Sequence, residues 1–489
     1  MAINEIMSAS AFQLNVEALV TSVMTMERRP LAGLQSDQMA LTRRSSTLSD
    51  LKSALSALRS KAQALVQAGT LSPFQAKAVS SSSASVATAT ASTTALAAVH
   101  ALSVSQLAKS STVVSKQVTS GATDVVTAEG AGAKSVKVTY DGTDPATSGT
   151  AVTVNVTVNA GDTNSTILTA LATAINNDAT LSAKISASVV NDTSSTSRLV
   201  LTGKQTGLAN KVRVADAAAG GTLLATVQLN SESASSGTAG GYLFADATLD
   251  AKFKLDGLDI TRSSNSVSDA LTGVTINLLG LSASDVTLTV TPDKSAIKAS
   301  VQGFLDAYNK AVTFLRERVD VKVGVSGSSG SATKINSVVR GPLAGEPTYT
   351  ALVSNLRSEA GSSVSGVQAG NPALLAEVGI TAASNGTLSI SDTTTFDSAI
   401  DTKLSGVIDL FASSGGVSTR LVARLDGFVN TGGLIDGSLS TVTSKVSSIN
   451  QQIATLQNRL DGREATLRKQ LVGLQKALSV LSGQRFILQ

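Results

Sequence analysis

Several kinds of side chain are missing or scarce in this 489-residue sequence. It contains no cysteine and no tryptophan, it has one histidine, and aromatic residues make up only 3% of it. Without cysteine there is no thiolate nucleophile, no disulfide and no cysteine-built zinc site. The single histidine, His100, has no second histidine with which to share a metal ion, so we expect it to be structural. This inventory predicts no catalytic residues, no metal site and no cofactor.

Charge and long apolar runs are also scarce. Charged residues make up 15% of the chain, and the formal net charge is +4. No stretch combines basic with aromatic residues, so nucleic-acid binding is not expected. No apolar run approaches the roughly 18 residues of a membrane-spanning helix. The first residues lack the basic and apolar regions of a signal peptide. We therefore expect neither a transmembrane segment nor a cleaved signal peptide.

Leucine recurs at seven-residue intervals near the N-terminal end. One set is Leu34, Leu41, Leu48 and Leu55, and a second is Leu51, Leu58 and Leu65. These heptads predict a helix over residues 34–66 that carries a coiled-coil seam. Pro30 is expected either in the first turn of this helix or at a kink before it. The short apolar segment 14–26 is expected to become ordered only on a partner.

The C-terminal end has a similar pattern. Steps of three and four separate Leu439, Val442, Val446, Ile449, Ile453, Leu456 and Leu460. Arg463 and Glu464 occupy the next expected sites, and the pattern resumes at Leu467, Leu471, Leu474, Leu478 and Leu481. Such a shift resembles a four-residue stutter, which locally unwinds a supercoil. Gly462 and Gly473 each lower helix stability by up to about 1 kcal/mol, so we expect this end to be marginal alone.

The sequence between these ends is mostly of β type. Alternating or β-branched runs predict strands at 151–158, 198–202, 252–255 and 286–290. Apolar periodicity predicts helices over 166–175 and 295–318, and residues 324–331 have the composition of a Gly/Ser loop.

A seam of exposed leucines is unfavourable in water, so the two ends are expected to pair with each other or with other subunits. The predicted fold class is α+β, with a coiled-coil helical stalk from both termini and inserted β-rich head domains. The expected parts are terminal coiled-coil segments, flexible alone (1–40 and 440–489), a helical leg (41–80 and 292–439), a β-rich head (81–120 and 245–291) and an outer β-rich domain (121–244).

Several segments resemble, in order, the bacterial flagellar filament cap family, also called flagellar hook-associated protein 2. They are LNVEALV at 14–20, MERRPL at 26–31, ITRSSN at 260–265, GVTINL at 273–278, FLDAYN at 304–309, GGLI at 432–435 and REATLRKQL at 463–471. Residues 151–207, within the outer domain, are similar to a small module of flagellins and hook-associated proteins. Two departures keep apolar character: Gln13-Leu14-Asn15 replaces a Gly-Leu-Asp stretch, and Leu471 stands where the family often has Phe.

This resemblance implies a non-enzymatic structural protein that is secreted and lies at the distal tip of the flagellar filament. It implies a ring-shaped homo-oligomer, such as a pentamer, which prevents the loss of exported flagellin and promotes its polymerisation. Besides flagellin, the implied partners are the hook–filament junction proteins and a flagellar export chaperone.

Two other functions stay open at this point. One is a surface adhesin whose head domains bind mucin or glycans, and the other is a different flagellar axial or junction protein. We expect intramolecular packing for 41–66 and contacts with other subunits or flagellin for 1–33 and 461–489. The candidate contact residues are Leu14, Leu19, Val23, Arg28, Arg29, Leu467, Leu471, Leu474, Leu478 and Leu481.

Overall fold

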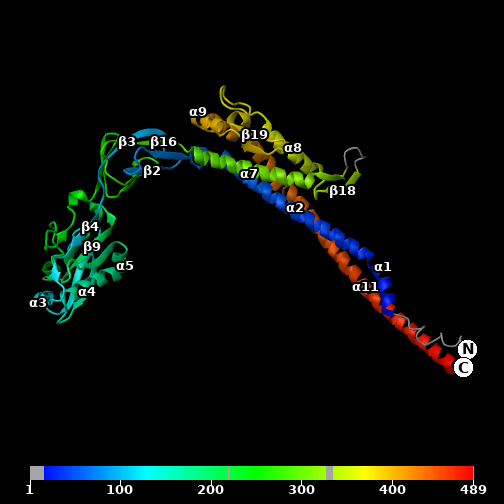
Figure 1. Ribbon diagram of the computed structural model, residues 1–489, viewed down its shortest axis with the longest axis horizontal. Coiled ribbons are helices and arrows are strands. Elements are labelled where there is room, and N and C mark those ends of the chain that lie inside the picture. Colours follow the sequence, from blue (N-terminus) through cyan, green and yellow to red (C-terminus); the bar gives the residue numbers. More distant parts are fainter. Residues whose placement is uncertain (1–15, 218–220, 327–333, 488–489) are drawn as a thin grey trace. The chain divides into compact units, whose positions relative to one another are not determined.

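A computed structural model describes residues 16–217, 221–326 and 334–487 of the chain, with side chains outside 322–339 and 482–487 (Figure 1). These residues form two compact units. The first contains the described residues up to Phe74 and those from Lys294 onward, and the second is Gln75–Asp293. The chain thus leaves the first unit and returns to it. The predicted α+β class, with long terminal helices and inserted β-sheet domains, is confirmed.

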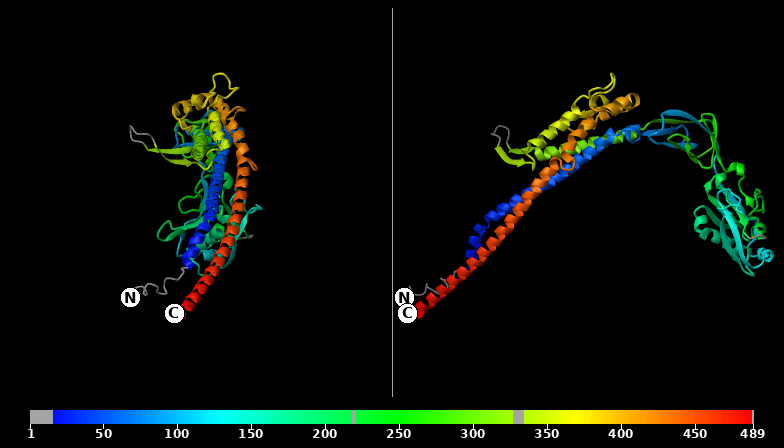
Figure 2. Two further views of the ribbon diagram at one scale, coloured as in Figure 1. Left: turned by 90° about the vertical axis from the view of Figure 1, so that its right-hand side faces the viewer. Right: turned by 180° about the vertical axis from the view of Figure 1, so that it is seen from behind.

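The first unit is mainly helical. Its helices are α1 (Val16–Glu27), α2 (Arg29–Val66), α7 (Lys294–Val319), α8 (Pro347–Gly361), α9 (Thr393–Ala412), α10 (Val417–Val429) and α11 (Leu434–Ile487). Two hairpins lie between helices of this unit. Strands β17 (Val321–Ser326) and β18 (Lys334–Arg340) lie between α7 and α8, and strands β19 (Ile380–Ala382) and β20 (Leu388–Ile390) lie between α8 and α9. Both views in Figure 2 show α2 beside α11. The predicted helices 34–66 and 295–318 are confirmed as α2 and α7, and Pro30 lies in the first turn of α2.

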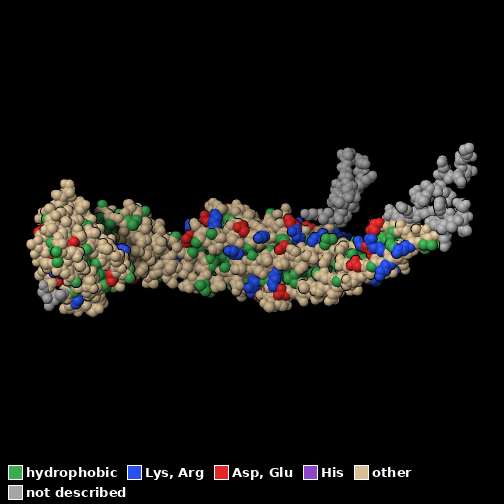
Figure 3. All heavy atoms as spheres, turned by 90° about the horizontal axis from the view of Figure 1, so that it is seen from below, with side chains coloured by type: hydrophobic (Ala, Val, Ile, Leu, Met, Phe, Trp, Pro, Cys, Tyr) green, Lys and Arg blue, Asp and Glu red, His purple; other side chains and the backbone are tan. Residues whose placement is uncertain are grey.

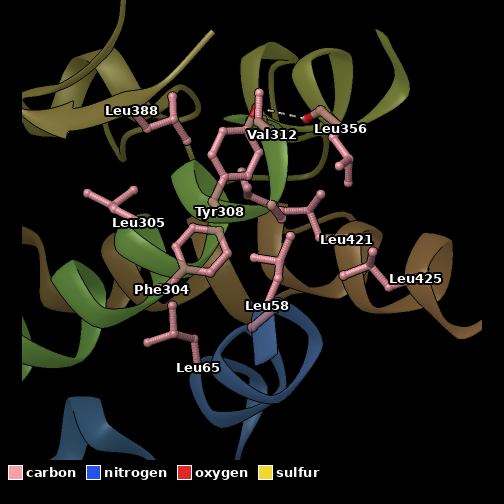
Figure 4. Close-up of a cluster of buried hydrophobic side chains, with 14 of the residues drawn as sticks. Leu58, Leu65, Phe304, Leu305, Tyr308, Val312, Leu356, Leu388, Leu421 and Leu425 are labelled. Carbon is pink, nitrogen blue, oxygen red and sulfur yellow. Dashed lines mark hydrogen bonds between the residues drawn. The ribbon is translucent and has the colours of Figure 1, made fainter. Parts of the chain in front are cut away.

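The core of this unit forms where α2 meets α7 and α10. The heptad leucines of α2 from Leu48 to Leu65 are at most 1% exposed. They pack with an apolar stripe of α7 that includes Phe304 and Tyr308, as Figure 4 shows. The Tyr308 hydroxyl donates a hydrogen bond to the Leu356 carbonyl at 3.3 Å, so the core leaves this polar group paired. Each buried leucine contributes roughly 1.5–3 kcal/mol, which explains why this part of the seam is internal.

One sequence-based expectation fails in this unit. Residues 324–331 have a loop composition, yet the chain is extended through Ser326, and β17 pairs antiparallel with β18 from Val321 opposite Arg340. Cross-strand pairing overrides the weak strand propensity of glycine and serine at 324–326. The rest of the predicted loop, 327–333, lies outside the described residues.

The second unit contains a β-sandwich around one apolar cluster. A five-stranded sheet has the order β1-β16-β3-β12-β13, and a three-stranded sheet has the order β14-β15-β2. The strands are β1 (Lys77–Ser81), β2 (Ala87–Ala91), β3 (Ala98–Gln106), β12 (Ala251–Leu255), β13 (Leu258–Arg262), β14 (Ser266–Leu271), β15 (Val274–Leu278) and β16 (Val286–Pro292). The predicted strands 252–255 and 286–290 are confirmed as parts of β12 and β16.

His100 lies on β3 in this sandwich. Its Nδ1 is 2.7 Å from Asp256 Oδ2, and the same carboxylate accepts the Ala101 N–H at 2.9 Å. Asp256 has a positive φ of 51° and precedes Gly257 in the tight turn between β12 and β13. These bonds hold the pKa of Asp256 below its usual value, the His100 bond most strongly. His100 therefore fixes a hairpin turn against the neighbouring strand.

A second apolar cluster of this unit lies between residues 113 and 242. It is enclosed by the sheet β10-β6-β7, the sheet β11-β4-β9-β5 with β8 paired to β9, and helix α4 (Asn164–Asn177). The strands are β4 (Ser110–Val114), β5 (Val118–Thr119), β6 (Gly132–Thr139), β7 (Val152–Val158), β8 (Ile185–Val190), β9 (Thr196–Thr206), β10 (Arg213–Asp216) and β11 (Gly241–Tyr242), with short helices α3 (Asp124–Glu129), α5 (Ala179–Ser182) and α6 (Leu223–Thr226). The predicted strands 151–158 and 198–202 and the predicted helix 166–175 are confirmed. The finer four-part division of the chain stays a prediction.

Candidate assembly surface on the terminal coiled coil

Helix α1 docks on α11 of its own chain. Val20 and Met24 are 2% and 3% exposed, and they form one apolar cluster with Leu456 and Leu460. Leu31 and Leu34 at the start of α2 extend this cluster. Figure 2 shows α1 lying along α11. The expectation that residues 14–26 become ordered only on a partner is therefore wrong for the described part, because α11 itself supplies the apolar face.

A network of four charged residues joins α1 and the residue that follows it to α11, and we call it the charged clasp: Glu17, Arg28, Glu464 and Arg468. Arg28 Nη2 donates to Glu464 Oε2 at 2.8 Å. Arg468 donates to both carboxylate oxygens of Glu17, at 2.6 and 2.8 Å, and to Glu464 at 3.1 Å. Its two-pronged contact with Glu17 is the geometry that a planar guanidinium favours. The clasp thus joins residues that are far apart in the sequence: Arg28 and Glu464 are separated by 436 positions, and Glu17 and Arg468 by 451.

Glu464 explains the register shift in the C-terminal leucine pattern. Helix α11 continues through it without a break. The buried face of α11 steps from Leu456 to Leu460 and then by four to Glu464, before Leu467 and Leu471 resume it. The Glu464 side chain is only 24% exposed and lies between Arg28 and Arg468. The predicted stutter is therefore a point where a charged residue takes a seam position.

The charges of the clasp change the acidity of its members. The hydrogen bond from Arg468 lowers the pKa of Glu17 below its ordinary value of 4.5. Glu17 and Glu464 in turn raise the pKa of Arg468. Because these side chains are largely exposed, water and salt screen them, and the clasp directs docking more than it stabilises it.

A polar pair lies between the α1 cluster and the large apolar cluster around α2, α7 and α10, which we call the leg core or leg cluster. Gln38 Nε2 donates to Asn450 Oδ1 at 2.6 Å, across α2 and α11. On one side of it Leu41 and Val446 belong to the large leg cluster. On the other side Leu34 belongs to the α1 cluster. The apolar residues on the two sides of this pair thus belong to two clusters that share no residue.

The predicted contact residues fall into distinct groups. Leu467 and Leu471 pack against the α1 cluster, and Arg28 is part of the clasp. Val23 and Leu478 are partly buried, Arg29 is exposed, and Leu14 lies outside the described residues. The strongly exposed leucines are Leu19 at 45%, Leu474 at 49% and Leu481 at 62%. The side chains that remain available to another molecule are therefore mainly these three leucines and Arg29.

Sequence reasoning missed further parts of this surface. Met26, Val472 and Val480 are also exposed apolar residues. Five basic and two acidic residues lie between 459 and 476 of α11, and Figure 3 shows Lys and Arg side chains gathered over this part of the helix. Glu17 pairs with Arg468 across 451 positions, a contact that no local pattern marks. The terminal segment thus presents an apolar surface with a basic surround.

This architecture defines a class: proteins whose two chain ends pair as long helices and carry inserted β-sheet domains. The models for the flagellar hook-associated protein 2 N-terminus and C-terminus match residues 13–111 and 248–482. The B-type flagellar hook-associated protein 2 of Pseudomonas aeruginosa is 31% identical over 438 residues, 88% of this chain and 85% of the relative. The chain belongs to the flagellar hook-associated protein 2 family, whose members are flagellar filament caps.

Two further comparisons agree with this family. The flagellar hook-associated protein 2 of Escherichia coli K12 is 26% identical over 96% of this chain and 94% of the relative. The crystal structure of the D1-D2-D3 domains of the flagellar cap protein FliD from Escherichia coli has a TM-score of 0.56 and 25% identity, covering 81% of this chain and 99% of that one. The predicted filament cap is confirmed, and nothing supports the adhesin alternative.

The family is a structural one. Among the described helices, none combines the length and the apolar character that crossing a membrane requires.

Proposed function

We propose that copies of this chain form a ring at the distal end of the flagellar filament, outside the cell, where they retain exported flagellin and promote its polymerisation. The proposed role is mechanical and involves no catalysis. Family membership supports the cap, and the surface on the terminal coiled coil supports the way in which it engages its partners. The hook–filament junction proteins and an export chaperone stay predicted partners.

The observation that carries this proposal is the exposed apolar surface near the end of α11. Leu474 and Leu481 are 49% and 62% exposed on a helix whose preceding leucines are packed. Exposed leucine is unfavourable in water, so covering these side chains stabilises a contact. The surrounding basic residues favour a partner helix that combines apolar with acidic side chains. We therefore assign Leu19, Arg29, Leu474 and Leu481 to contacts with flagellin or neighbouring subunits.

The remaining predicted residues have a supporting part in this proposal. Leu467, Leu471 and Arg28 hold α1 against α11. Because this docking is separated from the leg core and fastened by screened charges, the terminal segment can release and rebind at low energetic cost. A ring of such segments can leave one position open at a time, in which a new flagellin subunit folds.

The test is complementation of a strain that lacks its own cap protein. The variant carries Leu474→Asp and Leu481→Asp, which charge the exposed surface without touching the described core. We expect it to fold, to leak flagellin into the medium and to build short filaments or none. The matched control is Leu434→Asp, because Leu434 is 52% exposed on the same helix but at its opposite end.

Normal filament length with the double variant would contradict the role of this surface. The ring would be contradicted if purified wild-type protein formed no ring-shaped oligomer in negative-stain images at any protein concentration tested.

A further inference from the structure

Strand β7 has a free edge. It is the last strand of the sheet β10-β6-β7 and pairs only with β6, from Val152 opposite Val138 to Val158 opposite Gly132. Among the described residues, no hydrogen bond reaches the backbone of Val152–Val158 other than those of the β6 ladder. Alternate N–H and C=O groups along seven residues therefore point away from the sheet, which makes this edge a template for another strand.

The other long edges of this unit are protected. The Asn176 side chain donates to the Ala187 carbonyl at 2.7 Å and accepts its N–H at 3.0 Å, which blocks the edge of β8. Strand β2 is uncharged but lies against β1. The remaining edges of more than two residues carry charged side chains, at Lys77 of β1, Arg213 and Asp216 of β10, Asp259 and Arg262 of β13, and Asp269 of β14. Strand β7 has no charge, proline or bulge, so it lacks the side-chain and backbone protections against strand pairing.

The sequence of β7 is a palindrome centred on Asn155, namely Val-Thr-Val-Asn-Val-Thr-Val. In an antiparallel pair of two such strands, Asn155 lies opposite its own copy and Thr153 lies opposite Thr157. Threonine, asparagine and threonine are exposed, whereas the valines at 154, 156 and 158 are at most 5% exposed. This register continues both the polar and the apolar face of the sheet across the join, as cross-strand pairing requires.

The space beside this edge is open. A groove of about 630 Å³ runs between β7 and α4. Its walls are Asn155, Val156 and Thr157 of β7 and small side chains of α4: Ser165, Thr166, Thr169, Ala170, Thr173 and Ala174. None of these residues is charged, so an uncharged strand meets neither electrostatic repulsion nor a bulky side chain there.

We propose that β7 pairs antiparallel with β7 of a second copy of this chain, so that two three-stranded sheets become one continuous sheet. The occupant is a second copy because the strand is complementary to itself. Such a contact is isologous: it closes pairs and cannot by itself build a ring. It is therefore an interface additional to those of the proposed ring, and it joins subunits through the domain farthest in sequence from the chain ends.

Cysteine cross-linking of the full chain tests the register, since the protein has no native cysteine. Across the two-fold axis the two Cα atoms at position 155 lie about 4.5–5.5 Å apart, within the range that a disulfide spans. The matched control is Thr153→Cys, on the same strand and face, whose two copies lie four residues out of register, roughly 13 Å apart. We expect Asn155→Cys to give at least tenfold more disulfide-linked dimer than Thr153→Cys under mild oxidation.

A second variant tests the same register independently. Thr153→Cys combined with Thr157→Cys places each new thiol opposite the other, so efficient cross-linking should return. Equal cross-linking of the two single variants, or no dimer with Asn155→Cys and with the double variant, would overturn the β7 contact. Ring formation and filament elongation are measured separately, so failure of this interface is distinguishable from failure of the proposed function.

Discussion

At the scale of single residues, the charged clasp shows why a carboxylate can replace a leucine in a helical seam. Glu464 occupies a position between Leu460 and Leu467, where an unpaired charge would be strongly unfavourable. Arg28 and Arg468 both donate hydrogen bonds to it, so this carboxylate is paired on both sides although its side chain is only 24% exposed. This pairing favours the register of α1 on α11 that brings these charges together.

A double-mutant cycle between Arg28→Ala and Glu464→Ala measures the clasp. We expect a coupling of about 0.2–1 kcal/mol in the free energy of α1 opening, as for other partly exposed ion pairs. Amide hydrogen exchange of α1 reports that opening. The coupling should fall at high salt, and Glu464→Leu should increase the protection of α1, because it completes the apolar seam. A coupling that is unchanged by salt would contradict this account.

The lowered pKa of Glu17 makes the docking of α1 on α11 depend on pH. Its pKa is lowered because Arg468 donates to the carboxylate, so the ionised form is favoured in the docked state. The contribution of this pair to the stability of α1 docking is therefore fully present above the ordinary pKa of 4.5 and is lost as the pH falls through the lowered value. An NMR titration of the Glu17 carboxyl carbon should give a midpoint below 4.5, and Arg468→Gln should return it toward that value. A midpoint that Arg468→Gln does not move would exclude the pair.

At the scale of elements, periodicity predicted the parts of the fold that depend on local pattern. The heptads of α2, the steps of α11 as far as Leu460 and the stripe of α7 correspond to buried or half-buried faces, whereas Leu474 and Leu481 are exposed. The docking of α1 could not be predicted, since it depends on side chains more than 400 positions away along the chain. The clasp has no periodic signal for the same reason. Strand β17 was missed because pairing with β18, not composition, makes residues 324–326 extended.

Leu460→Ala tests whether α1 docking is independent of the leg core. Leu460 is 5% exposed and packs with the α1 cluster, which the Gln38–Asn450 pair separates from the leg cluster. We expect a loss of about 2 kcal/mol, at the low end for a buried leucine, confined to the protection of α1 and the start of α2. The protection of α7 should not change. Leu474→Ala is the control, because Leu474 is 49% exposed and its truncation should leave α1 protected.

At the scale of the whole molecule, the chain is two compact units, and the second is an insertion in the first. The first has its large cluster around α2 and α7, whereas the second has two clusters of its own. None of these clusters shares a residue with another. We therefore expect a substitution in one cluster to lower the stability of its own unit only, because the effects of substitutions that share no partners are independent.

Calorimetry with one substitution in each unit tests this division. Phe304 and Leu201 are both fully buried. Phe304 belongs to the leg cluster, and Leu201, on β9, belongs to the cluster that includes α4. Phe304→Ala should remove about 3–5 kcal/mol from the first unit and lower its transition by roughly 10 °C. Leu201→Ala should lower only the transition of the second unit, by a similar or smaller amount. If either substitution lowers both transitions equally, the units unfold as one, because a shared transition requires that the loss of either core unfolds the other.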